Sequence, residues 1–329
     1  MKLPGEAETI ADGIRNMRIR GAGLIARSAV EALQIVAHDS KAEDVDAFIE
    51  ELTEASRYLL QTRPTAVSLP NGIRYVMHRV NMAKNASKSI EGVRTAAMRA
   101  AEDFIENAKS AVERIGEIGA RRIKDGDVLL THCNSSAVTE VMKKAWEQGK
   151  KFEVFVTETR PRFQGHITAR ELANAGIPVT IILDDAVRYF MQHVDKVLVG
   201  ADAITANGAL VNKIGTSMVA LAAHEARVKV FVAAETYKFS PETIIGELVT
   251  IEERDPSEVI SREERERIGS IKVLNPSFDV TPPEFIDLII TERGIIPPLG
   301  AILILEEVFG VVTPEELREY QTYSLEEEA

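Results

Sequence analysis

The stretch Val128-Leu129-Leu130-Thr131-His132-Cys133-Asn134-Ser135-Ser136 decides how we expect this chain to fold. Val128 to Thr131 follow the polar Asp125-Gly126-Asp127 and predict a short buried strand, after which polar residues mark the start of a helix. Ligands of open α/β sheets bind at the carboxyl ends of strands, and hydroxyls beside a helix N-terminus suit a phosphate. We therefore expect Cys133, the only cysteine of the 329 residues, to lie in a ligand site.

Beyond this stretch, short β-branched runs alternate with amphipathic segments. The runs that predict strands are 128–131, 152–157, 179–183, 196–200, 228–233 and 286–291. Strands that alternate with helices predict parallel βαβ units. We expect residues 125–329 to form a doubly wound, Rossmann-like domain.

Residues 1–124 show helical periodicity instead. Ser40 with Glu43 predicts a capping box, and the helix that follows ends at Arg63-Pro64. A second long helix is predicted over residues 92–123. The expected fold class is α/β, with an N-terminal helical domain followed by a Rossmann-like parallel-sheet domain. Two domains also suit a length of 329 residues, which exceeds what one hydrophobic core usually serves.

Composition narrows the class of partner. With 51 acidic and 39 basic residues the formal charge is −12, which argues against a general nucleic-acid binder but allows a local basic pocket. No apolar run reaches membrane-spanning length, the first thirty residues lack a secretory apolar region, and one cysteine permits no intrachain disulfide. We expect a cytoplasmic protein with a small-molecule partner, and neither a nucleic-acid nor a membrane partner.

One apparent cofactor motif is set aside. Gly21-Ala22-Gly23-Leu24-Ile25-Ala26 fits the G-x-G-x-x-A pattern of dinucleotide binding, but the charged residues 14–20 before it do not form a buried strand. Arg20 beside two glycines at a helix start could hold an anion, and a tight turn between helices explains the pattern equally well. The sequence has no Walker A loop, no H-E-x-x-H and no Cys/His cluster, so we expect neither a metal nor an organic cofactor.

A carboxylate follows a second predicted strand, at the same edge of the predicted sheet as Cys133. The run Lys196 to Gly200 leads to Asp202, and parallel strands share their polarity, so the two side chains could face one ligand. The polar groups of Asn212-Lys213-Ile214-Gly215-Thr216-Ser217 open a later apolar helix, and Lys213 and its neighbours suit a phosphate or a sugar hydroxyl. Structural alternatives stay open, with Asp202 as a turn or N-cap carboxylate and Cys133 as a small buried hydrophobe.

Several motifs together resemble one superfamily in their order and spacing. The chain is similar to the superfamily that joins sugar-1-phosphate aldose-ketose isomerases with the regulatory subunits of translation initiation factor 2B. The resemblance spans nearly the whole chain. Its motifs are Arg20-Gly21-Ala22, Arg63-Pro64-Thr65-Ala66, Thr131-His132-Cys133-Asn134, Glu158-Thr159-Arg160-Pro161, Val199-Gly200-Ala201-Asp202, Asn207-Gly208, Asn212-Lys213-Ile214-Gly215-Thr216, Phe278-Asp279-Val280-Thr281-Pro282-Pro283 and Ile289-Ile290-Thr291-Glu292.

Within the superfamily, three positions favour one branch. The alpha-type initiation factor subunits usually lack the cysteine and carry glutamate for the aspartate, whereas this chain has Cys133 and Asp202. Lys238 lies where methylthioribose-1-phosphate isomerases generally have a Pro/Ser/Thr-rich segment, and a cation there suits a second phosphate better than a thioether. The segment resembles archaeal ribose-1,5-bisphosphate isomerases. The alternatives are a methylthioribose-1-phosphate isomerase and a non-catalytic subunit like those of the initiation factor.

The resemblance implies an isomerase that converts ribose 1,5-bisphosphate to ribulose 1,5-bisphosphate in AMP salvage. It implies that Asp202 opens the sugar ring as an acid and that Cys133 removes the C2 proton, through an enol-type intermediate. For this we expect a raised pKa of Asp202 and a lowered pKa of Cys133. It also implies a homo-oligomer, a dimer or a ring of dimers. The substrate-binding residues that it implies are Arg20, Gly21, Ala22, Gly23, Arg63, Ser135, Ser136, Ala137, Asn212, Lys213 and Lys238.

Overall fold

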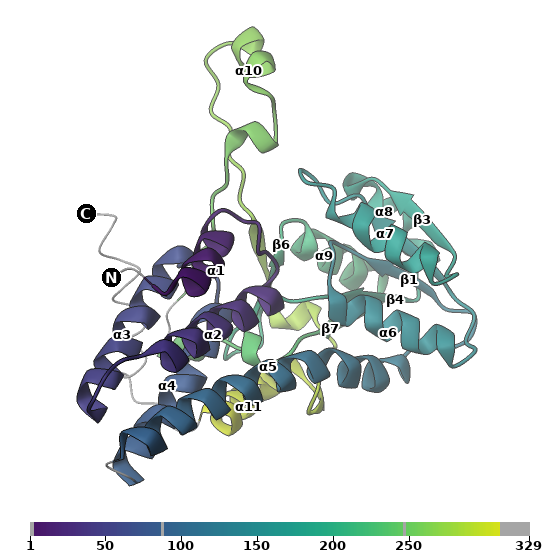
Figure 1. Ribbon diagram of the computed structural model, residues 1–329. Helices are drawn as coiled ribbons and strands as arrows, with labels where there is room; N and C mark the ends of the chain where they lie inside the picture. Colours follow the sequence, from purple (N-terminus) through teal and green to yellow (C-terminus); the bar gives the residue numbers. More distant parts are fainter. Residues whose placement is uncertain (1–2, 87–88, 246–247, 310–329) are drawn as a thin grey trace. The chain divides into compact units, whose positions relative to one another are not determined.

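The computed structural model describes residues 3–86, 89–245 and 248–309 (Figure 1). Its contacts group these residues into two compact units. Unit 1 holds the described residues up to 110 together with 237–245 and 305–309, and unit 2 holds residues 111–236 and 248–304. The domain boundary expected between residues 124 and 125 stays a prediction.

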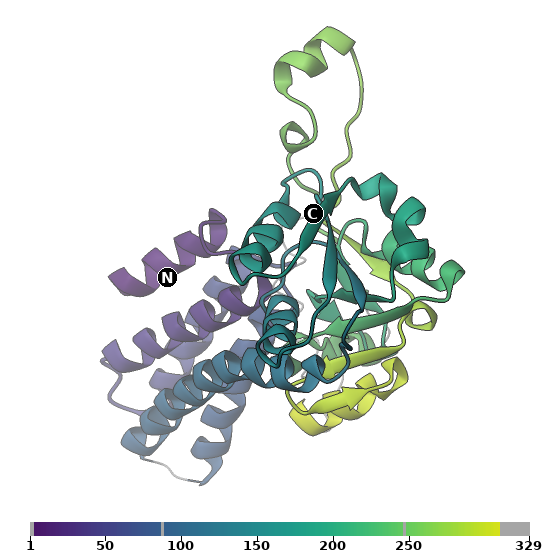
Figure 2. The same ribbon diagram turned by 90° about the vertical axis from the view of Figure 1, so that its right-hand side faces the viewer.

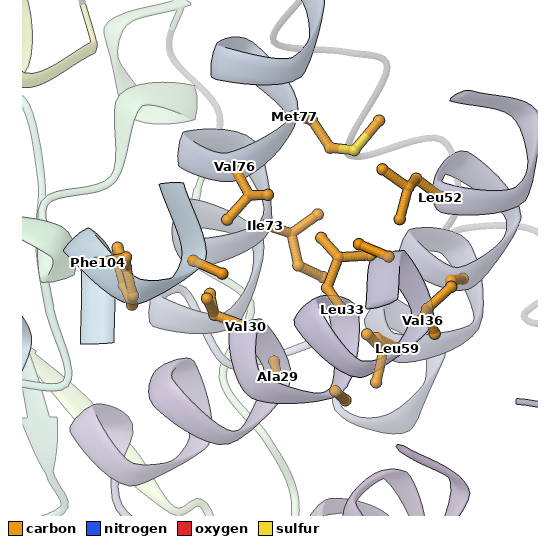
Figure 3. Close-up of a cluster of buried hydrophobic side chains, with 14 of the residues drawn as sticks. Ala29, Val30, Leu33, Val36, Leu52, Leu59, Ile73, Val76, Met77 and Phe104 are labelled. Carbon is orange, nitrogen blue, oxygen red and sulfur yellow. The ribbon is translucent and has the colours of Figure 1, made fainter. Parts of the chain in front are cut away.

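Unit 1 is helical. It contains α1 (Gly5–Arg15), α2 (Ala22–Asp39), α3 (Val45–Thr62), α4 (Ser68–Ala86) and the first part of α5 (Ile90–Ala120). Helix α2 packs against α1, α3 and α4. The core between these helices is aliphatic, with Leu33, Leu52, Leu59 and Ile73 all fully buried (Figure 3). Burial of side chains at helical spacing stabilises such a bundle, at roughly 1.5–3 kcal/mol for each large aliphatic side chain.

The start of α3 differs from the prediction. Asp44 is the N-cap, and its side chain accepts a hydrogen bond from the N–H of Ala47 at 2.8 Å. Ser40 instead ends α2 and donates from Oγ to Glu51 Oε2. The predicted Ser40/Glu43 capping box is therefore wrong, because Asp44 caps as well as serine and lies directly before Val45, where the apolar periodicity begins.

Unit 2 contains a seven-stranded sheet in the order β10-β9-β7-β4-β1-β2-β3. All neighbouring strands are parallel except the edge pair β9 and β10. The strands are β1 (Val128–Thr131), β2 (Glu153–Thr157), β3 (Val179–Ile182), β4 (Lys196–Val199), β7 (Lys229–Ala233), β9 (Leu288–Thr291) and β10 (Gly294–Ile296). Each of the six predicted runs thus contains a strand.

The direction of winding reverses between β1 and β4. The chain passes from β1 through α6 (Ser136–Glu147) to β2 and through α7 (Gln164–Asn174) to β3. It then returns through α8 (Val187–Phe190) to β4 on the other side of β1, and α9 (Thr216–Ala226) leads to β7. Right-handed crossovers in opposite directions place the two helix pairs on opposite faces of the sheet. The predicted doubly wound, Rossmann-like sheet is confirmed.

Two features of unit 2 are absent from the sequence predictions. A small antiparallel sheet contains β5 (Ala203–Ile204), β6 (Leu210–Lys213) and β8 (Phe278–Thr281), with the expected turn at Asn207-Gly208 between its first two strands. The second is the long green arm in Figure 2, which carries α10 (Arg262–Ile268). The last described helix is α11 (Ala301–Phe309). Within the described part of the chain, no helix combines the length and apolarity needed to cross a membrane.

Candidate functional site

Cys133 lies two residues after β1 in an unusual backbone conformation. Its φ is 70°, in the left-handed region that costs energy for a residue with a side chain. Its N–H donates to Thr159 Oγ1 at 2.9 Å, and its carbonyl accepts from Thr168 Oγ1 at 2.8 Å. Hydroxyls from the loop after β2 and from α7 therefore hold both sides of Cys133 in this conformation.

Thr159 is itself held by the end of the next strand. It also has a left-handed backbone, with φ 60°, and its N–H donates to Asp184 Oδ1 at 2.8 Å. The N–H of Arg160 donates to the other carboxylate oxygen of Asp184 at 2.7 Å. The carboxyl ends of β1, β2 and β3 thus form one hydrogen-bonded network. Asp184 is not among the predicted site residues, although it follows a predicted strand as Asp202 does.

His132 connects this network to the loop before α9. Its Nδ1 lies 2.7 Å from Thr157 Oγ1 and its Nε2 lies 2.8 Å from the carbonyl of Ile214. A carbonyl only accepts, so Nε2 carries the hydrogen and Nδ1 accepts from the threonine hydroxyl. Burial lowers the pKa of His132, with a smaller opposing effect from Asp184. A Cβ at Gly215 would lie 3.0 Å from the ring, so a glycine lets this loop approach the imidazole.

The thiol of Cys133 is protonated in the free protein. Burial of the sulfur, with smaller contributions from the negative charges of Asp202 and Asp184, raises the pKa of Cys133 to about 12, although the residue as a whole is half-buried. Lys213 and a hydrogen bond from the backbone of Asn134 act in the opposite direction. The predicted lowering of this pKa is therefore wrong for the free protein, because loss of hydration outweighs the cation. The charges of Asp202, Asp184 and Lys213 thus act on the thiol of Cys133.

Asp202 follows β4, the strand beside β1 at the reversal of the sheet. It is half-buried, and its N–H donates to the carbonyl of Val211 at 3.0 Å. A Cβ at Gly200 would lie 2.5 Å from Ser135 Oγ, so the residues after β4 closely approach the start of α6. Cys133 and Asp202 thus occupy the ends of adjacent parallel strands, as the sequence predicts, at the topological position where open α/β sheets bind ligands.

Lys213 ends β6, and its positive charge acts on the thiol of Cys133. Its Nζ lies 4.8 Å from the centre of the Phe278 ring, within cation-π distance. The side-chain amide of Asn212, the residue before it, donates to Thr216 Oγ1 at 3.0 Å and is buried. Asn212 therefore fixes the turn that presents Lys213.

The N-terminus of α9 already holds an anion from within the chain. Asp279 accepts from the N–H of Gly215 at 2.7 Å and from the N–H of Ser217 at 3.1 Å. Burial raises its pKa to about 6, while these hydrogen bonds and Lys213 act to lower it. A phosphate cannot use the same two N–H groups while Asp279 holds them. The sequence predicts Asp279 as part of a family motif but not its contact with α9. That contact depends on β8, which the sequence does not reveal.

The predicted residues 135–137 open α6. Ser135 is the N-cap of this helix. Its Oγ accepts a hydrogen bond from the N–H of Val138 at 3.5 Å. Ser136 is exposed and Ala137 is buried. Backbone N–H groups in the first turn have no partner within their own helix. They lie directly after Cys133 and Asn134, so this helix start, unlike that of α9, can serve an anion next to the thiol.

The remaining predicted binding residues belong to unit 1. Arg20 is exposed and precedes Gly21, the N-cap of α2, whose φ is 88°. No strand precedes this glycine, since α1 ends at Arg15, and the dinucleotide motif is excluded as predicted. Arg63 is the C-cap of α3 and half-buried.

A hydrogen bond brings two of the motifs in unit 1 together. Ser68 Oγ, at the start of α4, donates to the carbonyl of Ala22 at 2.8 Å, next to Gly23 in the first turn of α2. This hydrogen bond holds the start of α4, which residues 63–66 precede, against the first turn of α2, which contains Ala22 and Gly23. Lys238 ends a short 3-10 turn in the same unit and is 6% exposed.

Comparison with known proteins gives the family. Residues 18–298 match the Initiation factor 2 subunit family. The chain is 57% identical over 311 residues to a protein of Thermococcus kodakarensis named ribose 1,5-bisphosphate isomerase, covering 94% of this chain and 97% of that one. It is 58% identical over 306 residues to a protein of the same name from Pyrococcus furiosus, covering 93% and 94%.

Solved structures agree with this placement. A translation initiation factor eIF-2B of Pyrococcus horikoshii superposes with a TM-score of 0.76 at 34% identity, over 91% of this chain and 100% of that one. A 5-methylthioribose 1-phosphate isomerase of the same organism superposes with a TM-score of 0.72 at 32% identity, over 93% and 88%. The resemblance that the motifs predict is confirmed, and the chain belongs to the Initiation factor 2 subunit family.

Proposed function

We propose that this protein is an aldose-ketose isomerase that converts α-D-ribose 1,5-bisphosphate to D-ribulose 1,5-bisphosphate. The observation that carries the proposal is the placement of Cys133 and Asp202 at the ends of adjacent parallel strands, with Lys213 close enough for its charge to act on the thiol. A thiol, a carboxyl and a cation at one ligand-binding edge suit the transfer of a proton between neighbouring carbons. Several relatives that carry this enzyme name are 52–58% identical to the chain.

The proposed chemistry starts with one proton on the sulfur. In the free protein the raised pKa of Cys133 keeps the thiol protonated. Transfer of that proton to Asp202 gives the acid that protonates the ring oxygen, and it leaves a thiolate beside Lys213. The thiolate then takes the C2 proton, and an enol-type intermediate forms. The thiol returns this proton to C1 while the C2 hydroxyl gives its proton to the carboxylate of Asp202, which yields the ketose. This order conserves one proton within the pair, and it starts from the thiol that burial keeps neutral in the free protein.

The substrate-binding residues that the family resemblance implies are cations or lie at helix starts. In unit 2 the first turn of α6, at residues 135–137, and the side chains of Asn212 and Lys213 are proposed to bind substrate. In unit 1 the proposed groups are Arg20 with the backbone of residues 21–23, Arg63 and Lys238. Guanidinium and ammonium groups suit phosphate dianions, and N–H groups at a helix start add to the attraction.

One assay separates the candidate functions. Purified protein is offered ribose 1,5-bisphosphate or 5-methylthioribose 1-phosphate, and ketose formation is followed. We expect turnover of the bisphosphate and not of the methylthio sugar, because the buried cation Lys238 suits a second phosphate. Preference for the methylthio sugar would assign the chain to that isomerase instead. Turnover of neither sugar would favour a non-catalytic role, and the similar structure at 34% identity is named a translation initiation factor.

The setting of the reaction is also a proposal. We propose that the product enters AMP salvage, that the protein works in the cytoplasm, and that it acts as a homo-oligomer, a dimer or a ring of dimers.

A further inference from the structure

We infer that Asn71 positions Lys238 and thereby contributes to recognition of the bisphosphate. Asn71 lies in the first turn of α4 and is 1% exposed. Its Nδ2 donates to two backbone carbonyls, that of Tyr237 at 2.9 Å and that of Phe239 at 2.7 Å. These carbonyls belong to the residues directly before and after Lys238. One amide group therefore fixes the backbone on both sides of the proposed phosphate-binding lysine.

The orientation of the amide is set by its other atom. Asn71 Oδ1 accepts from Arg74 Nη1 at 2.8 Å, and a guanidinium only donates. The nitrogen must therefore face the two carbonyls, which only accept. Arg74 also forms a buried ion pair with Glu242, in the same segment as Lys238, and Ser240 Oγ donates to Glu242 at 3.0 Å. The hydrogen bonds are mutually consistent and hold residues 237–242 against α4.

The helix that contains Asn71 is packed closely against its neighbours. A Cβ at Gly72 would lie 3.0 Å from Val30 Cγ2 and 3.2 Å from Phe104 Cζ, so α4 approaches these side chains closely. The ring of Tyr237 packs against that of Phe104, with 5.6 Å between centres. Such packing leaves little freedom for the segment to shift. A lysine whose backbone is fixed and whose side chain is 6% exposed loses less conformational entropy when it binds a phosphate.

The test substitutes the amide alone. Asn71→Asp keeps the acceptor for Arg74 and places a carboxylate oxygen against the carbonyls of Tyr237 and Phe239. We expect KM for ribose 1,5-bisphosphate to rise about tenfold, the effect of one or two lost hydrogen bonds, with kcat changed by less than about twofold. Asn71→Ser, which removes the contact without adding charge, is the second variant if the aspartate variant does not fold. Asn81→Asp, an exposed asparagine of the same helix, is the matched control and should change neither constant.

A positioning role is separated from a general packing role by a double substitution. Lys238→Ala alone should raise KM, and adding Asn71→Asp to it should raise KM no further, because the asparagine acts through the lysine. Multiplied effects of the two substitutions on KM would overturn the inference.

A second readout does not depend on the proposed activity. In the full-length protein, reductive methylation followed by peptide mass spectrometry should find Lys238 protected relative to the exposed Lys84, and Asn71→Asp should remove that protection. Unchanged protection of Lys238 in both Asn71 variants would refute the positioning contact. If the unmodified protein has no isomerase activity, the proposed function fails, while the methylation result still decides whether Asn71 holds Lys238.

Discussion

At the scale of single residues, the chemistry depends on a thiol that the fold keeps neutral. Burial and two carboxylates raise the pKa of Cys133 to about 12. Because Cys133 is the only cysteine, alkylation of the protein reports on this thiol alone. We expect iodoacetamide at pH 7.5 to react at least about tenfold more slowly with the folded protein than with the unfolded chain, whose thiol has an ordinary pKa of about 8.5. Equal rates in the two states would contradict the account.

Asp279 provides a residue-scale test of pH dependence. Its pKa is raised to about 6, whereas an unfolded aspartate titrates near 3.9. The folded state therefore favours the protonated carboxyl, and its contribution to stability is present below about pH 4 and lost as the pH rises through about 6. Relative to Asp279→Asn, the natural protein should lose free energy of unfolding between pH 4 and 6. Urea unfolding of both proteins at several pH values measures this difference, and a difference that does not vary with pH would contradict the prediction.

At the scale of elements, the ends of β1, β2 and β3 share one hydrogen-bond network around Cys133. Thr159→Ala removes the hydroxyl that accepts from the Cys133 N–H and leaves that donor without its partner. We expect kcat to fall about tenfold or more with KM nearly unchanged, and stability to fall by about 1–2 kcal/mol. Steady-state kinetics of this variant provide the check. Thr180→Ala, at an exposed position of β3, is the control, and an unaffected kcat in Thr159→Ala would exclude the positioning role.

The elements also show how far the sequence predicts the structure. The strands beside Cys133 and Asp202 were predictable, because short apolar runs between polar turns have few other interpretations. The small sheet was not, since β5 has two residues and the paired residues of β6 and β8 lie 65–71 positions apart in the sequence. Contacts such as Thr159 with Cys133 or Asn71 with Tyr237 depend on tertiary packing, which no local pattern encodes. The raised pKa of Cys133 was missed for the same reason, because the sequence does not show how much water the loop excludes.

At the scale of the whole molecule, the predicted binding residues divide between two compact units. Arg20, Arg63 and Lys238 belong to unit 1, and Cys133 and Asp202 to unit 2. The family resemblance spans both units, as does the match over residues 18–298. We predict that the protein forms a homo-oligomer in solution. Light scattering coupled to size exclusion should give at least twice the mass of one chain, and a single-chain mass at micromolar concentration would contradict this.

The most direct test of the central claim is the rate of ketose formation from ribose 1,5-bisphosphate by three proteins. The natural protein should turn over this substrate, and Cys133→Ser and Asp202→Asn should each lower kcat by about 10²-fold or more, the usual effect of losing a general acid or base. Circular dichroism and the unfolding temperature of each variant confirm that the fold is intact. Near-natural rates in either folded variant would remove that residue from the mechanism and contradict the proposed proton transfer between the ends of β1 and β4.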